Sequence, residues 1–147
     1  MAKRSKRLQV VLDLAERKRK QADQLLAEAQ NRVLQDQQTL EQLQQYYSEY
    51  ANNFYADGAA GVSVSQLHTH QAFMHKLRQA IAQQQQARQI NEDQLARVKE
   101  HWQSVYGHFK AIDSLVEKAR DEERIQEEKS QQKQLDERSQ LIRPPYI

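Results

Sequence analysis

Apolar residues recur at alternating steps of three and four along most of this 147-residue chain, the spacing of a coiled-coil seam. In the first half the series is Leu8, Val11, Ala15, Ala22, Leu25, Ala29, Val33, Leu40, Leu43, Tyr47, Tyr50 and Phe54, with Lys18 filling one step. This series requires one extra step of four near Leu25 and Leu26, a stutter that locally unwinds a supercoil. In the second half one unbroken frame runs through Met74, Leu77, Ile81, Leu95, Val98, Trp102, Val105, Phe109, Ile112, Val116 and Ala119. Two long helices are therefore predicted.

The composition agrees with an all-α fold. Three glycines and two prolines cannot supply the turns of a sheet protein of this length. A mean hydropathy of −1.00 with 38% hydrophobic residues leaves too little apolar surface for a compact globular core, so an elongated molecule is predicted. Cysteine is absent, which excludes disulfides and thiolate metal sites. No apolar run approaches transmembrane length, so membrane association is expected only through partners.

One stretch, residues 54–67 (FYADGAAGVSVSQL), holds two of the three glycines and predicts the single turn. Asp57-Gly58 is expected to stop the first helix, with Gly58 taking a positive φ. Ser63 and Gln66 have the spacing of a capping box, and Val62 can staple to Leu67. So short a connection folds long helices back antiparallel. We predict a single coiled-coil rod over residues 1–147, with helices at about 3–56 and 63–140, a turn at about 57–62 and a tail at 141–147.

A turn centred near residue 60 predicts that facing residues have numbers summing to about 120. Under this rule Leu8 faces Ile112 and Val11 faces Phe109. The same rule places Asp36 beside Gln84 and one turn from Arg88, so the polar interruptions of the two seams coincide. Such a layer either specifies the register, at a cost in stability, or consists of half-exposed residues in a loosely packed zone.

Charge is uneven along the chain, although the formal net charge is only +2. Residues 1–20 carry eight lysines and arginines against two acidic residues, and Asp121, Glu122 and Glu123 are expected opposite them. Either these acids neutralise the basic segment, or it contacts an acidic partner or a nucleic acid. No aromatic residues are interleaved with the lysines, so nucleic-acid binding is not expected. A filament-forming structural protein built from the same heptads is a further alternative.

Near the turn the apolar surface is broader than a two-helix seam requires. Besides its seam residues, the second helix has a further row of Phe73, Leu77 and Ala80. The first helix has a broad apolar arc of Leu40, Leu43, Tyr46, Tyr47 and Tyr50. One facing helix does not cover both rows, and leftover apolar surface of this kind is typical of a protein-binding face. In the alternative interpretation, the helices rotate to bury the excess, or the tyrosines keep only their hydroxyl ends in water.

No motif for catalysis is present: no phosphate-binding glycine loop, no nucleophile elbow and no acid–base pair. His68 and His75 lie seven residues apart, as do His101 and His108, which places each pair too far apart for one zinc ion. We therefore predict a protein that is not an enzyme and needs no cofactor or metal.

Four segments carry a resemblance: MAKRSKRLQVVLDLAERK at the start, LQQYYSEY before the turn, HQAFMHKLRQAIAQQQQ after it, and the charged carboxyl-terminal helix. Over essentially its whole length the chain resembles the FliJ family of bacterial flagellar export proteins. The resemblance implies a non-enzymatic cytoplasmic component of the type III export apparatus, folded like the central stalk of rotary ATPases. It further implies that the chain promotes the ring of the ATPase FliI, engages the export gate protein FlhA, binds export chaperones and associates peripherally with the inner membrane.

The same resemblance assigns residues to these roles. The gate-binding patch of the family is similar to Leu43, Tyr46, Tyr50, Phe73, Leu77 and Ala80, with Gln84 at the end of the row where some relatives carry histidine. The ATPase-facing end is implied to include Lys3, Arg4, Lys6, Arg7, Arg120 and Arg124.

Overall fold

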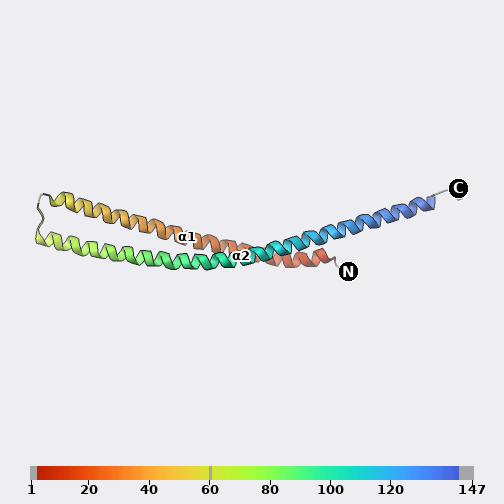
Figure 1. The fold of residues 1–147 in the computed structure, drawn as a ribbon, viewed down its shortest axis with the longest axis horizontal. Helices are drawn as coiled ribbons and strands as arrows, with labels where there is room; N and C mark the ends of the chain where they lie inside the picture. The colour runs from red at the N-terminus through yellow and green to blue at the C-terminus, as the bar shows by residue number, and fades with distance from the viewer. Residues whose placement is uncertain (1–2, 60, 143–147) are drawn as a thin grey trace. The chain divides into compact units, whose positions relative to one another are not determined.

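The structure is a computed structural model that describes residues 3–59 and 61–142, and these residues form two α-helices. Helix α1 spans Arg4–Gly58 and helix α2 spans Val64–Ile142. Figure 1 follows the chain along α1, through the turn and back along α2. The predicted all-α pair of packed helices is confirmed. Each helix ends two residues later than predicted, and residues 143–147 of the predicted tail lie outside the described residues.

Contacts divide the chain into two units, and each contains a part of both helices. The first unit comprises Met1–Gln21 and Gln103–Ile147, and the second comprises Ala22–Trp102. We describe the two units separately, and the single rod over residues 1–147 stays a prediction.

The less exposed residues of α1 form a heptad repeat without a stutter, so the predicted stutter is wrong. Leu12 and Ala15 serve as the first and fourth positions of a heptad, a and d, and the frame continues through half-buried Leu26. Val11 and Leu25, which were expected in the seam, are 45% and 49% exposed. The members of the seam are Ser5, Leu8, Leu12, Ala15, Arg19, Ala22, Leu26, Ala29, Val33, Asp36, Leu40, Leu43, Tyr47, Tyr50 and Phe54.

The seam of α2 matches its prediction. One frame runs from Met74 to Ala119 and includes the polar residues Gln84, Arg88 and Asn91, all of which are half-buried. The structure extends it to His70 on one side and to Glu123 on the other. In an antiparallel pair with these frames, the g positions of both helices lie on one side of the seam and the e positions lie on the other.

The register differs from the prediction by about one helical turn. In the second unit the rings of Phe54 and His70 stack with centroids 3.6 Å apart, and the numbers of these residues sum to 124. The buried cluster of the first unit, Leu12, Ala15, Ile112 and Val116 with Leu8 and Phe109 packed against it, fits the same sum. The predicted sum of 120 is therefore too low by about four, and Val11, which is 45% exposed, does not pair with Phe109 in the core. Leu8 packs against the cluster that contains Ile112. The cause of the shift in register is the turn, which lies between Gly58 and Val64 and is thus centred later than residue 60.

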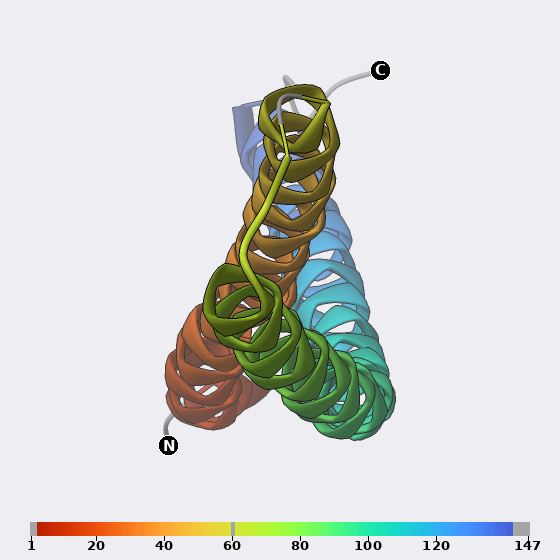
Figure 2. The ribbon, with the colours of Figure 1, turned by 90° about the vertical axis from the view of Figure 1, so that its left-hand side faces the viewer.

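The turn uses its glycines differently from the prediction. Gly61 has the positive φ, 98°, and its N–H donates to the Gly58 carbonyl at 3.0 Å. Gly58 is the last helical residue, and a β-carbon there would meet Val62 Cγ2 at 3.3 Å. The capping box is confirmed, because Ser63 N–H donates to Gln66 Oε1 and Gln66 N–H donates to Ser63 Oγ, each at 3.1 Å. Figure 2 looks onto this connection between the two helices.

Replacing Leu12 and Val11 in turn by alanine tests the corrected heptad frame. Leu12→Ala removes a buried side chain from the cluster of the first unit and should lower the free energy of unfolding by about 2 kcal/mol or more. Val11→Ala trims an exposed side chain and should change this free energy by less than ~0.5 kcal/mol. Urea denaturation followed by circular dichroism measures both values. A larger loss for Val11→Ala than for Leu12→Ala contradicts the frame.

Candidate partner-binding site

The residues predicted to bind a partner all lie on one side of the helix pair in the second unit. In the observed frame Leu43, Tyr50, Leu77 and Gln84 occupy d positions, and Tyr46, Phe73 and Ala80 occupy g positions. Phe73 and Ala80 of the second apolar row are therefore g residues, whereas Leu77, its third member, is a d residue of the seam. The g positions of both helices flank the seam on the same side, so their side chains form one continuous surface. We call this surface the aromatic patch; it consists of Tyr46, Phe73 and Ala80 with their half-buried neighbours Leu43, Tyr50 and Gln84.

Aromatic side chains at the centre of this patch contact one another across the seam. The rings of Tyr50 and Phe73 have centroids 4.4 Å apart, and Tyr46 meets the edge of Phe73 at 6.1 Å. Tyr46 also lies 6.4 Å from Tyr50 along α1. Edge-to-face and offset arrangements of this kind contribute beyond the area that they bury. Contact within the patch therefore covers part of its apolar surface, while Tyr46 remains 50% exposed.

Burial separates the predicted patch residues into three groups. Leu77 is only 7% exposed and belongs to the core, so it offers no surface to a partner. Leu43, Tyr50, Phe73, Ala80 and Gln84 are half-buried, and Tyr46 is the exposed member. Tyr46 and Phe73 are thus the side chains that a partner would cover most directly.

Two aromatic residues that were not assigned to the patch extend it toward the turn. His70 lies between Tyr50 and Phe54, with ring centroids at 5.2 and 3.6 Å and interplanar angles of 10° to both. Beside these three rings a pocket of about 410 Å³ opens, lined also by Asp57, Gly61, Val62, Ser65, Gln66 and Thr69. The sequence contained one signal for His70: it lies seven residues before Leu77 and therefore occupies a d position in the seam frame of α2.

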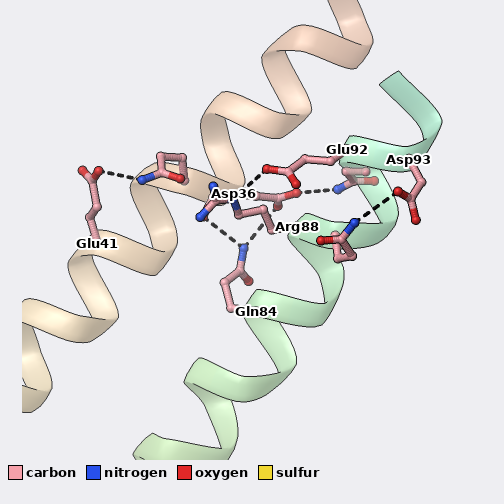
Figure 3. Close-up of polar contacts among 9 residues, drawn as sticks. Asp36, Glu41, Gln84, Arg88, Glu92 and Asp93 are labelled. Atoms are coloured by element: carbon pink, nitrogen blue, oxygen red, sulfur yellow. Dashed lines mark hydrogen bonds and ion pairs between the residues drawn. The ribbon is translucent and has the colours of Figure 1, made fainter. Parts of the chain in front are cut away.

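A layer of polar side chains borders the patch on the side away from the turn (Figure 3). Gln84 Nε2 donates to Asp36 Oδ1 at 3.2 Å and to the Asp36 carbonyl at 3.4 Å, and Asn91 Nδ2 donates to Asp36 Oδ2 at 2.5 Å. Arg88 lies between the two amides along α2 and pairs with Glu92 at 2.9 Å. The predicted meeting of Asp36 and Gln84 is confirmed. Since both carboxylate oxygens are satisfied, this layer favours the interpretation as a register-specifying layer.

In the first unit a carboxylate from α2 caps the start of α1. The first N–H groups of a helix have no partner within the helix, and Lys3, Arg4, Lys6 and Arg7 put positive charge at the positive end of the helix dipole. Glu123 compensates for both effects. It accepts from Ser5 Oγ at 2.6 Å and from Ser5 N–H at 3.0 Å. These two bonds, together with nearby Lys3 and Arg120, hold the pKa of Glu123 below its ordinary value.

The basic residues predicted to face an ATPase are exposed. Arg120 donates to Gln9 Oε1 at 2.6 Å, and Arg124 lies 3.7 Å from Asp121. Arg4 lines a shallow pocket of about 170 Å³ with Glu122 and Glu123. Glu123 therefore directs its carboxylate at the backbone and hydroxyl of Ser5, and the long basic side chains around Ser5 remain in solvent.

The described residues, 3–59 and 61–142, show neither a metal site nor a membrane span. This part of the chain contains no group of three or more histidine, aspartate or glutamate side chains placed to hold a metal ion. Within it, neither helix has a segment long and apolar enough to cross a bilayer.

Comparison with known proteins links this arrangement to a flagellar family. The profile of the family described as Flagellar FliJ protein matches residues 4–142. The Flagellar FliJ protein of Escherichia coli (strain K12) is 29% identical over 135 residues, which cover 90% of each chain. No solved structure matches the chain.

Replacing Asp36 tests the role of the polar layer. Asp36→Ala leaves the Gln84 and Asn91 amides without their acceptor and should lower the free energy of unfolding by about 1–3 kcal/mol. Gln37→Ala, which removes only an exposed contact with Glu41 in the same helix, is the control and should cost less than ~0.5 kcal/mol.

Replacing the whole layer separates specificity from stability. The triple variant with leucine at positions 36, 84 and 91 should be at least as stable as the parent chain but less uniform in register. Because the chain has no cysteine, engineered cysteine pairs placed across the seam report the register directly. A triple variant that keeps the parent pattern of cross-links contradicts a register-specifying layer.

The Glu123 cap predicts a dependence of stability on pH. The pKa of Glu123 is lower in the folded chain than its ordinary value of 4.5, so the unfolded chain binds the proton more readily. The cap therefore contributes stability above that ordinary value, and the contribution is lost as the pH falls through the lowered pKa. Glu123→Gln should lower the melting temperature at pH 7 and narrow the difference in melting temperature between pH 7 and pH 3. Glu122→Gln, which removes the same charge without the Ser5 bonds, should leave this difference closer to that of the parent chain.

Proposed function

Because the chain belongs to the FliJ family of flagellar proteins, we propose that it acts as a stalk-like coiled coil that links the export ATPase to the export gate. Membership makes the chain a non-enzymatic component of the flagellar export apparatus. In the proposal its partners are the FliI ring, the gate protein FlhA and the export chaperones. ATP hydrolysis then belongs entirely to FliI, and the coiled coil promotes the assembly and activity of the ring by position and charge.

The observation that carries the proposal is the aromatic patch. Tyr46 and Phe73 come from different helices and stand together on the same side of the seam, with Tyr46 half in solvent. Aromatic residues of this kind are enriched at the centres of protein interfaces, where they contribute most of the binding energy. We assign the patch to contact with FlhA, with Tyr50 and Ala80 as its half-buried surroundings and Gln84 as its polar border.

The basic residues of the first unit supply a second contact of different character. Lys3, Arg4, Lys6 and Arg7 extend from the first turn of α1 and are exposed. A cluster of like charges attracts an acidic surface over long range and weakens as salt is added. We assign this cluster, with Arg120 and Arg124 on α2, to the FliI ring. An association with the cytoplasmic face of the inner membrane then follows from the partners.

A variant of the patch tests the proposed contact with the gate. Tyr46→Ala with Phe73→Ala removes the rings that a partner would cover, so the affinity for the cytoplasmic part of FlhA should fall at least ~10-fold, as measured by calorimetry. Helix content should remain, since the seam is intact. Leu77→Ala is the contrasting variant and should lower the melting temperature, because Leu77 is core.

A charge variant serves as the matched control for the same measurement. Lys6→Glu with Arg7→Glu should leave FlhA binding unchanged and reduce the stimulation of FliI turnover, with an effect that shrinks at high salt. Unchanged FlhA affinity in the folded patch variant would remove the aromatic patch from the proposal.

A further inference from the structure

The end of the helix pair beside the turn carries a second pocket, on the side of the seam away from the aromatic patch. It measures about 390 Å³ and is lined by Phe54, Tyr55, Gly58, Ala59, Val62, Ser63, Val64 and Leu67. Gly58 and Val64 occupy e positions, whereas Tyr46 and Phe73 of the patch occupy g positions. Gly58 and Val64 therefore lie on the opposite side of the second unit from Tyr46 and Phe73, although Phe54 and Val62 line both pockets.

Large apolar side chains around this pocket are left in water. Tyr55 is 77% exposed, Val64 is 71% exposed and Leu67 is 42% exposed. An apolar cluster around a concave site is a typical mark of an interface, in contrast to single exposed apolar residues scattered over a surface. Packing within the chain explains part of the cluster, because the ring of Phe54 stacks on His70. The ring of Tyr55 meets Phe54 edge to face, with centroids 6.4 Å apart, but remains 77% exposed, and Val64 is 71% exposed.

The charge of this region restricts what can bind there. Between Glu49 and Lys76 the only aspartate, glutamate, lysine or arginine is Asp57, although such residues make up 29% of the whole chain. Asp57 lines the pocket beside the aromatic patch and is absent from the lining of this one. A charged group buried here would lose its hydration without gaining a partner. An anionic lipid surface would require lysines or arginines, which residues 50–75 lack.

We propose that this pocket, bounded by Tyr55, Val64 and Leu67, binds an uncharged apolar segment of a partner protein, which inserts one aliphatic or aromatic side chain. Gly58 lies in the wall of the pocket beside Val62, whose Cγ2 would lie 3.3 Å from a β-carbon placed on Gly58. The site is thus formed by both helices and the turn, and it exists only in the folded hairpin. Its affinity depends on apolar burial, so salt should weaken it little.

Site-specific photocross-linking in flagellated cells tests this proposal with the full-length chain. A benzophenone amino acid replaces Tyr55 in one strain and Tyr46 in another, and each strain lacks the unmodified chain. Both tyrosines are exposed, and they lie on opposite sides of the seam, so Tyr46 reports the aromatic patch and Tyr55 reports the pocket. Mass spectrometry identifies the cross-linked segment. The expected product at Tyr55 is a protein segment without lysine, arginine, aspartate or glutamate at the site of attachment.

A charge placed in the pocket supplies the matched comparison. Leu67→Glu should reduce the yield of the Tyr55 product at least ~10-fold and leave the Tyr46 product unchanged. His68→Glu adds the same charge in the same turn of α2 outside the pocket and should reduce neither product. An acidic residue near the start of a helix is favourable, so both variants should fold, and Val64→Glu replaces Leu67→Glu if circular dichroism shows otherwise.

Any other outcome at Tyr55 overturns the inference. A Tyr55 product with a charged segment, with lipid or with a second copy of the chain assigns the pocket to a different occupant. A product that survives Leu67→Glu, or the absence of any product at Tyr55, removes the pocket as a binding site. Failure at Tyr46 alone counts against the proposed gate contact and leaves the pocket standing.

Discussion

The phase of the heptad repeat determines which side chains this chain keeps for itself and which it offers to others. A two-helix pair buries only the a and d positions, so a shift of one residue exchanges core for surface along a whole helix. In the observed phase Leu12, Ala22 and Leu77 are core, and Val11, Leu25 and Tyr46 are exposed. The aromatic patch lies at the surface because Tyr46 and Phe73 occupy g positions, which flank the seam. In a solvated coiled coil these positions usually carry charged residues.

The sequence was sufficient for the fold class, the stretch that contains the turn and the frame of α2, but not for the centre of the turn or the phase of the first part of α1. Apolar residues occupy both alternatives there: Val11 and Leu12, or Leu25 and Leu26. Ala15, Ala22 and Ala29 belong to either frame, so counting apolar residues does not distinguish them. Contacts across the seam do, because Ser5 meets the Glu123 carboxylate and the Arg19 guanidinium lies 5.0 Å from the centre of the Phe109 ring. Contacts of polar residues across the helix pair thus determine the heptad phase of α1, which the apolar residues alone leave ambiguous.

The candidate site was predicted in outline for a related reason. Asp36 was placed beside Gln84 by a pairing rule that was wrong by four residues, yet the contact is present because Asp36 bridges two amides seven residues apart, Gln84 and Asn91. A register error of about half a heptad therefore still places Asp36 beside one of the two amides. The burial of single residues could not be obtained in this way. Leu77 shares the patch side with Phe73, and only the packed pair shows that Leu77 is buried and Phe73 half-buried. The stacking of His70 on Phe54 likewise depends on side-chain directions that residue spacing does not encode.

A protein without catalytic groups acts through the differences between its surfaces, and here these differences are physical. The first turn of α1 concentrates positive charge, so its contacts are long-ranged and sensitive to salt. Residues 50–75 carry almost no charge and expose aromatic and aliphatic side chains, so their contacts depend on shape and burial. Surfaces of these two kinds do not compete for the same partner. A charged partner would lose the hydration of its charges on the apolar surface, and an apolar partner would bury solvated charges on the basic one. The chain therefore presents two surfaces of different chemistry, one charged and one apolar.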